Sequence, residues 1–277
     1  MDKKTKLYVL LLSVLLILLA LLFLLDPPDS PRTLSKAAYV AIGLAVGLGR
    51  VLFTQRQQKN ETEARYRHSY QEFIEGAFAD ERAQEQKLFQ AIRAYNDSQY
   101  DAALKTLSAL REKCRNDRDR YAVTVFEALC RYDAQQYEEA LEKYLEALRL
   151  RPSCTLFSNL GLCYQRMGNL RRAEEAYRRA TELDGEKPTP HINLAFLCFR
   201  MGRGKEGREH AQRALDIAPL EPKALKAMTL CCYLDGDMEA YQDYYARAVA
   251  NGVDGKELSS LYIENLAEAL ADKDGRA

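Results

Sequence analysis

The chain has 277 residues with 40 basic and 40 acidic side chains, and 47% of its residues are hydrophobic. This composition is that of a globular protein, and a net charge of zero excludes a general electrostatic attraction to nucleic acid, so we expect no nucleic-acid partner. The average conceals an asymmetry, because residues 1–53 hold six basic residues and only three acidic ones. The front of the chain is apolar and basic, and the remainder is slightly acidic.

The first predicted element is a membrane-spanning helix over residues 7–25. These 19 residues carry no charge and twelve of them are Leu, whereas a bilayer core requires about 20 apolar residues in a helix. A cleaved signal peptide is the alternative, since Lys3, Lys4 and Lys6 precede the apolar run. The run is long for that purpose, and Asp26-Pro27-Pro28-Asp29 stands where a cleavage site of small residues should lie. The pattern favours an anchor that stays in the membrane.

A second apolar stretch, Ala37–Phe53, is interrupted only by Arg50 and predicts a second spanning helix over residues 34–53. Three prolines in residues 26–32 indicate a tight turn, so the simplest arrangement is a two-helix hairpin. Small residues four apart in the second stretch would let two membrane helices approach closely, within the hairpin or between copies of the chain. They are Ala37, Ala41, Ala45 and Gly49, and also Gly43 and Gly47. Gly and Ala are common in membrane helices, so the spacing alone leaves open whether this is a packing face.

Charged residues beside the apolar stretches predict the orientation. Basic residues flank the hairpin on both sides, so both ends are expected in the cytoplasm with the turn outside. Seven cysteines without a CxxC motif lie in helical apolar patterns and are expected to be buried, reduced thiols. The sequence therefore predicts a two-pass membrane protein whose remaining domain is cytoplasmic.

Residues 54–85 are polar and helix-prone, and we expect them to form a helical linker. Beyond them the sequence repeats itself, in copies that are 37, 33, 34 and 34 residues apart. A period of this length is typical of helical repeat arrays. The aligned segments are Tyr100-Asp101-Ala102-Ala103, Tyr137-Glu138-Glu139-Ala140, Leu170-Arg171-Arg172-Ala173, Gly204-Lys205-Glu206-Gly207 and Met238-Glu239-Ala240-Tyr241.

The third copy carries the fullest pattern, with Phe157, Leu160-Gly161, Tyr164, Gly168, Leu170, Ala173, Tyr177 and Ala180. This pattern resembles the tetratricopeptide repeat (TPR), a helix–turn–helix unit of about 34 residues. The resemblance implies an all-α fold, a TPR solenoid of about five repeats over residues 86–253 behind the membrane hairpin. Residues 254–277 are expected to form a capping helix and a tail. The first and fifth copies depart from the pattern, as terminal repeats commonly do.

The sequence does not indicate a catalytic or cofactor site. Residues 202–207 match GxGxxG, but the resemblance places them in the turn and second helix of a repeat rather than after a strand. The histidines His68, His191 and His210 are scattered, without the spacing of metal ligands. We predict a non-enzymatic protein without a cofactor or metal.

In TPR arrays the first helix of each pair lines a concave groove, and the resemblance implies that a partner peptide binds there. The groove residues combine amide donors, cations and apolar side chains. They are Asn159, Asn193, Arg166, Arg200, Leu162, Phe196, Phe199, Tyr132 and Tyr233. Two alternatives remain open, because Asn is frequent here in repeats without known ligands and the Leu/Phe column can be buried between helices. A chaperone-type carboxylate clamp is disfavoured, since Val125, Leu129 and Asn193 replace its Lys, Asn and Arg.

The predicted function is that of a membrane-anchored adaptor, in which the hairpin presents a cytoplasmic TPR solenoid that recruits a protein or peptide partner. The alternative is a structural subunit of a membrane assembly, such as secretion, envelope or division machinery. In that case the membrane helices make the partner contacts. The two differ in whether recognition lies in the groove or in the hairpin.

Overall fold

The computed structural model describes residues 50–54, 56–256, 258 and 260. The predicted membrane hairpin, residues 7–25 and 34–53, lies outside the described residues except for its last four, which are helical. In the part of the chain that is described, no helix combines the length and the apolarity needed to cross a bilayer. The chain divides into two compact units, Met1–Ser69 and Tyr70–Ala277.

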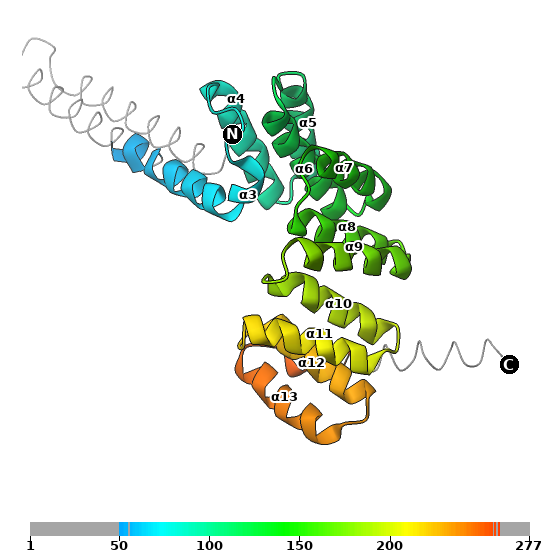
Figure 1. Ribbon diagram of the computed structural model, residues 1–277. Helices are drawn as coiled ribbons and strands as arrows, with labels where there is room; N and C mark the ends of the chain where they lie inside the picture. Colours follow the sequence, from blue (N-terminus) through cyan, green and yellow to red (C-terminus); the bar gives the residue numbers. More distant parts are fainter. Residues whose placement is uncertain (1–49, 55, 257, 259, 261–277) are drawn as a thin grey trace, which may run out of the picture. The chain divides into compact units, whose positions relative to one another are not determined.

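The second unit is a row of helical pairs that follow one another in chain order (Figure 1). A short helix, α3 (Gln71–Ile74), precedes them. The pairs are α4 (Arg82–Asn96) with α5 (Tyr100–Arg111), α6 (Asp117–Asp133) with α7 (Tyr137–Leu150), α8 (Cys154–Arg166) with α9 (Leu170–Leu183), α10 (Pro188–Arg200) with α11 (Gly204–Ile217), and α12 (Pro222–Leu234) with α13 (Met238–Ala250). Each second helix packs against the first helix of its own pair, and those of the first four pairs also pack against the first helix of the next. The all-α solenoid of five repeats that the sequence predicts is confirmed.

The turn inside each pair contains one residue with a positive φ angle. Gly168, Gly202 and Gly236 have φ of 78°, 70° and 74°, while Ser98 and Gln135 have 57° and 62° at the same place in the first two pairs. Glycine adopts this left-handed conformation freely, whereas a residue with a Cβ incurs roughly 1–2 kcal/mol. The turn geometry therefore accounts for the glycines in the last three repeats.

Small residues lie where the helices approach most closely, and large side chains fill the space beside them. A Cβ added to Gly161 of α8 would lie within 3.0 Å of three atoms of the Tyr177 ring, which is completely buried. A Cβ on Gly207 of α11 would lie 2.5 Å from Sγ of Cys231 in α12. Truncating a buried aromatic residue typically costs about 3–5 kcal/mol. The small residues of the repeat motif are thus dictated by the distance between packed helices.

The last pair is closed by aromatic side chains. Tyr241, which stands where the repeat pattern has a small residue, is half-buried and packs with Tyr244 and Tyr245 against the core of the last two repeats. Leu258 of the predicted capping segment is 3% exposed and belongs to the same core. The rest of the predicted capping helix and tail, from residue 261 onward, lies outside the described residues.

Candidate peptide-binding face

The first helices of the last three pairs bring most of the predicted groove residues into one register. Helices α8, α10 and α12 have thirteen residues each and begin 34 residues apart, so equivalent side chains recur along the array. We call these side chains the first-helix row. The row comprises Asn159, Leu162 and Arg166 on α8, Asn193, Phe196 and Arg200 on α10, and Tyr233 on α12. Tyr132, at the end of α6, borders it.

The side chains of the row differ in how much surface they offer. Arg166 and Arg200 are exposed, while Leu162 and Phe196 are half-buried and pack partly against the cores of their repeats. Phe199, which the sequence predicts as a groove residue, is only 6% exposed and belongs to the core of the last two repeats. The structure therefore places Phe199 in the core instead of on the predicted groove surface, and the arginines at the C-terminal ends of α8 and α10 are the accessible part.

Neighbouring side chains fix the orientation of the groups that border the row. The Nε of Arg166 donates to the hydroxyl of Tyr132 at 3.5 Å, which links the second and third repeats. This bond raises the pKa of Arg166, whose guanidinium is a cation throughout the neutral range. The Tyr132 ring packs edge-on against Tyr137 with centroids 5.6 Å apart. Arg166, Tyr132 and Tyr137 thus form one connected cluster at the border of the row.

Asn193 carries an unused donor. Its Nδ2 atom is buried and has no hydrogen-bond partner among the described residues. Leaving a buried donor unpaired costs about 1–3 kcal/mol. Asn193 is therefore an amide of the row whose donor is enclosed by the fold and unsatisfied by the described residues.

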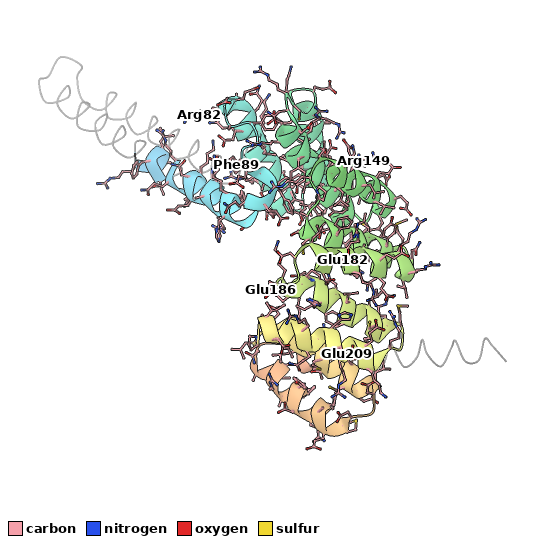
Figure 2. The ribbon with its side chains drawn as sticks, viewed as in Figure 1. Arg82, Phe89, Arg149, Glu182, Glu186 and Glu209 are labelled. Carbon is pink, nitrogen blue, oxygen red and sulfur yellow. The ribbon has the colours of Figure 1, made fainter. Side chains whose placement is uncertain are left out.

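The three first helices carry charge of one sign. Among their residues α8, α10 and α12 contain no Asp or Glu. Their charged side chains are Arg166, Arg200, Lys223 and Lys226. By contrast the second helices carry acidic residues, among them Glu182 of α9 and Glu209 of α11 (Figure 2). The charged members of the first-helix row, Arg166 and Arg200, are therefore both cations, in a chain whose net charge is zero.

Several acidic groups of the second helices form ion pairs within the array. Glu174 of α9 lies 2.7 Å from Arg203 and 2.8 Å from Arg178, and Arg178 also lies 2.8 Å from Glu206 of α11. These pairs connect the third and fourth repeats. The nearby guanidinium of Arg203 is the main cause that holds the pKa of Glu174 below its usual range.

A segment that precedes the repeats covers the first helices of the earlier pairs. The Tyr70 ring packs edge-on against Phe126 of α6, with centroids 5.1 Å apart, and its hydroxyl donates to Asn96 of α4. Phe73, at 8% exposed, and Ile74, at 9%, are buried directly after it. We call residues 70–78 the pre-repeat segment. From the sequence we predict only a linker here. The large apolar side chains concentrated in these few residues are the feature of the sequence that indicates a buried segment.

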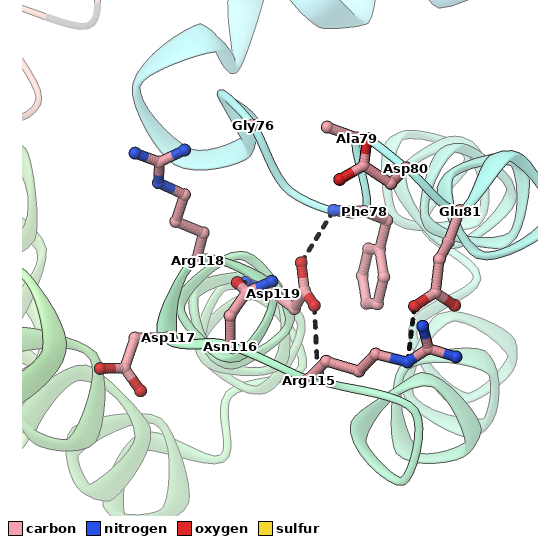
Figure 3. A pocket seen from close by; sticks show the side chains of 10 residues that line it. All are labelled: Gly76, Phe78, Ala79, Asp80, Glu81, Arg115, Asn116, Asp117, Arg118 and Asp119. Atoms are coloured by element: carbon pink, nitrogen blue, oxygen red, sulfur yellow. Dashed lines mark hydrogen bonds and ion pairs between the residues drawn. The ribbon is translucent and has the colours of Figure 1, made fainter.

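The pre-repeat segment ends in a turn that Asp119 anchors. Asp119 is 2% exposed and accepts hydrogen bonds from the backbone N–H of Phe78 at 2.8 Å and of Arg115 at 3.1 Å (Figure 3). A cavity of about 540 Å³ lies beside this turn. Its lining holds four acidic side chains and two basic ones, and Arg115 pairs with Glu81 at 2.9 Å. Asp119 is engaged by the backbone of the turn and Glu81 by Arg115, so we assign no ligand to this cavity.

The cysteines are packed in the interior of the repeats. All seven cysteines are free thiols and six of them are buried. Burial raises the pKa of Cys130 and of Cys163 to about 12, which keeps both protonated and poorly nucleophilic at neutral pH. Within the described residues no three His, Cys, Asp or Glu side chains form a group that could hold a metal ion.

Comparison with known families confirms the nature of the repeats. Two family models described as tetratricopeptide repeat match the chain, one over residues 90–153 and the other over residues 155–186. These two segments are tetratricopeptide repeats. Their range includes all of α5 to α9 apart from Cys154, together with the second half of α4.

Two curated relatives each match about a third of the chain. Cilia- and flagella-associated protein 70 of Macaca fascicularis is 30% identical over 95 residues, which are 34% of this chain and 9% of that protein. Photosystem I assembly protein Ycf3 of Synechococcus sp. (strain CC9605) is 36% identical over 89 residues, which are 30% of this chain and 51% of that protein. The chain thus spans about a tenth of the first protein and about half of the second.

Solved structures share the fold at low sequence identity. The MamA protein superposes with a TM-score of 0.52 at 15% identity, over 61% of this chain and 91% of that one. TTC0263, a thermophilic TPR protein in Thermus thermophilus, gives 0.51 at 17% identity, over 66% and 99%. YrrB, described as a TPR protein with an unusual peptide-binding site, gives 0.50 at 15% identity, over 71% and 96%. At these identities the likeness establishes the fold alone.

Proposed function

We propose that this chain is a membrane-anchored TPR scaffold that binds an acidic segment of a protein partner along the first-helix row. The observation that carries the proposal is the charge of the row. Three successive first helices contain no acidic residue, and Arg166 and Arg200 are exposed at equivalent positions one repeat apart. An acidic segment that follows the row would meet the same cation twice.

The other groups of the row suit a peptide in the same register. Asn159 and Asn193 are equivalent amides, and an amide side chain hydrogen-bonds a peptide backbone through either its donor or its acceptor. Leu162 and Phe196 offer half-buried apolar surface between the amides and the cations. Each exposed ion pair is worth about 0.2–1 kcal/mol, and a donor buried by the ligand about 1–3 kcal/mol. Affinity would therefore come from the amides and apolar groups, and charge selectivity from the arginines.

The mutational test compares two double variants. Asn159→Ala with Asn193→Ala should weaken partner binding without lowering the melting temperature by more than a few degrees. Arg166→Glu with Arg200→Glu should weaken binding further, and more steeply at low salt, because exposed charges are less screened there. If both variants stay folded and keep full affinity for the partner, the first-helix row is not the binding surface.

The membrane part of the proposal is supported by the sequence of residues 7–25 and 34–53. The basic flanks favour both ends in the cytoplasm. Protease treatment of intact cells should leave residues 80–277 protected, and digestion from outside would contradict this topology. A small-residue face on the second apolar stretch would allow self-association there, which crosslinking of the full chain in vesicles tests.

A further inference from the structure

The carboxylate of Glu72, in the pre-repeat segment, is held by groups that belong to the third and fourth repeats. The hydroxyl of Thr155 in α8 donates to its Oε2 at 2.8 Å, and the Nζ of Lys187, immediately before α10, lies 3.7 Å from the same oxygen. Arg151 donates to the backbone carbonyl of Glu72 at 3.4 Å. The Nζ of Lys187 also lies 3.7 Å from a carboxylate oxygen of Asp184, so Lys187 forms ion pairs with two carboxylates. Together Thr155 and Lys187 form an anionic subsite that this chain fills with its own side chain.

This subsite continues the first-helix row. Thr155, Asn159, Leu162 and Arg166 are spaced four, three and four residues apart, which places them on one face of α8. The eleven steps from Thr155 to Arg166 span about 16 Å of helix, a distance that about five residues of extended peptide cover. A bound peptide that followed the row toward the start of α8 would therefore meet Glu72 after about five residues.

Buried side chains and a backbone hydrogen bond hold the pre-repeat segment against the repeats, so the position of Glu72 is fixed by the fold. Phe73, Ile74 and Phe78 are each less than a tenth exposed. The backbone N–H of Phe78 is bonded to the buried carboxylate of Asp119. Displacing the segment would return these apolar side chains to water. A partner is thus expected to meet the segment in place.

We propose that the pre-repeat segment is a built-in competitor, in which Glu72 occupies the anionic subsite of Thr155 and Lys187 and excludes the carboxylate of a bound acidic peptide from it. The inference rests on the proposed function, since it concerns the same row and the same class of ligand. It assigns a boundary to the row at the N-terminal ends of α8 and α10, beyond which a bound peptide does not extend. It also implies that removing the carboxylate of Glu72 strengthens binding, which is the opposite of what a supporting contact would do.

The test uses the full chain in detergent micelles and a fluorescein-labelled peptide of three Glu-Glu-Leu-Gly units, with the corresponding Gln peptide as a charge control. Glu72→Gln should bind the Glu peptide about two- to fivefold more tightly than the unaltered chain, the range of one exposed ion pair. Glu75→Gln is the matched control, because Glu75 is exposed and, among the described residues, it is Glu72 and not Glu75 that bonds Thr155 and pairs with Lys187. It removes the same charge and should leave the affinity unchanged.

Two further variants locate the gain at the subsite. Adding Lys187→Ala to Glu72→Gln should return the affinity to that of the unaltered chain. Lys187→Ala alone should change it by less than about 1.5-fold, because Glu72 already neutralises that cation. The Lys187→Ala variant leaves the sequence of the pre-repeat segment unchanged, so it still tests the proposal if Glu72→Gln does not fold.

The outcomes separate the two proposals. If the unaltered chain prefers the Glu peptide but Glu72→Gln binds it no more tightly than Glu75→Gln does, the built-in competitor is overturned and the proposed function stands. A marked loss of affinity in Lys187→Ala alone also overturns it, since the subsite would then be open to the peptide. If neither the unaltered chain nor Glu72→Gln prefers the Glu peptide over the Gln peptide, the acidic-ligand function fails and the competitor fails with it.

Discussion

Replacing Gly161 by Ala tests whether the spacing between α8 and α9 dictates the small residue of the repeat. The added methyl group would lie within 3.0 Å of three atoms of the Tyr177 ring, which has no exposed surface into which it can move. Overpacking of this kind costs about 1–3 kcal/mol. Loss of the hydrogen bond from the Tyr177 hydroxyl to Gln165, which is 2.9 Å long, adds about 1 kcal/mol. The higher helix propensity of Ala returns about 0.5–1 kcal/mol.

The expected net effect of Gly161→Ala is a loss of about 1–3 kcal/mol in the free energy of unfolding. In a domain of this size that corresponds to a melting temperature lower by roughly 3–10 °C, measured by circular dichroism with urea denaturation as a second method. The same substitution in a Tyr177→Leu background should be neutral or slightly stabilising, because the ring that clashes is gone. A change below about 0.5 kcal/mol in the unaltered background, or equal effects in both, would refute this explanation.

Three further predictions follow from single features of the fold. Burial lowers the pKa of His191 and of His210, whose rings lie 5.9 Å apart, so the folded state binds fewer protons than the unfolded state. The free energy of unfolding should therefore fall as the pH drops below about 6.5. Replacing both residues by Gln should reduce the dependence of the melting temperature on pH in that range, and an unchanged profile would contradict this. Gln135→Gly should raise the free energy of unfolding by about 0.5–1 kcal/mol, because φ is 62° at that turn, and a decrease in urea denaturation would argue against strain. Asp119→Ala should speed hydrogen exchange at Phe78 and its neighbours before it affects α7 to α13, whereas uniform exchange would show that Asp119 does not anchor the turn.

The repeats were predictable from the sequence because their contacts are local. A close approach between neighbouring helices requires a small residue such as Gly161, and the aromatic residue beside it, Tyr177, comes sixteen positions later in the same repeat. The turn glycines follow from backbone geometry in the last three repeats. The first two turns use Ser98 and Gln135 in the same conformation, and no residue type there signals it.

The features that sequence reasoning missed depend on contacts between distant parts of the chain. The pre-repeat segment is too short to show a helical period, and its burial arises from α6, with Phe78 bonded to a residue 41 positions away. Phe199 occupies the same column as Gln165 and Tyr233, which are half-buried. It is buried because α10 packs directly against α12, and the column alone does not indicate this. The sequence shows that α8 and α10 each contain an arginine and no acidic residue. Only the packing of the helices shows that both arginines are exposed at equivalent positions.

Site-specific photocrosslinking in cells tests the central claim, that the first-helix row binds an acidic segment of a protein partner. A benzophenone amino acid placed at Phe196, in the row, is compared with one at Leu220, which is 67% exposed and lies outside it. We expect the Phe196 probe to crosslink to a stretch of partner rich in Asp and Glu, identified by mass spectrometry, and to lose that product when Arg166 and Arg200 are both replaced by Glu. Crosslinks that form only at Leu220, or that survive the charge reversal at Phe196 unchanged, would contradict the claim.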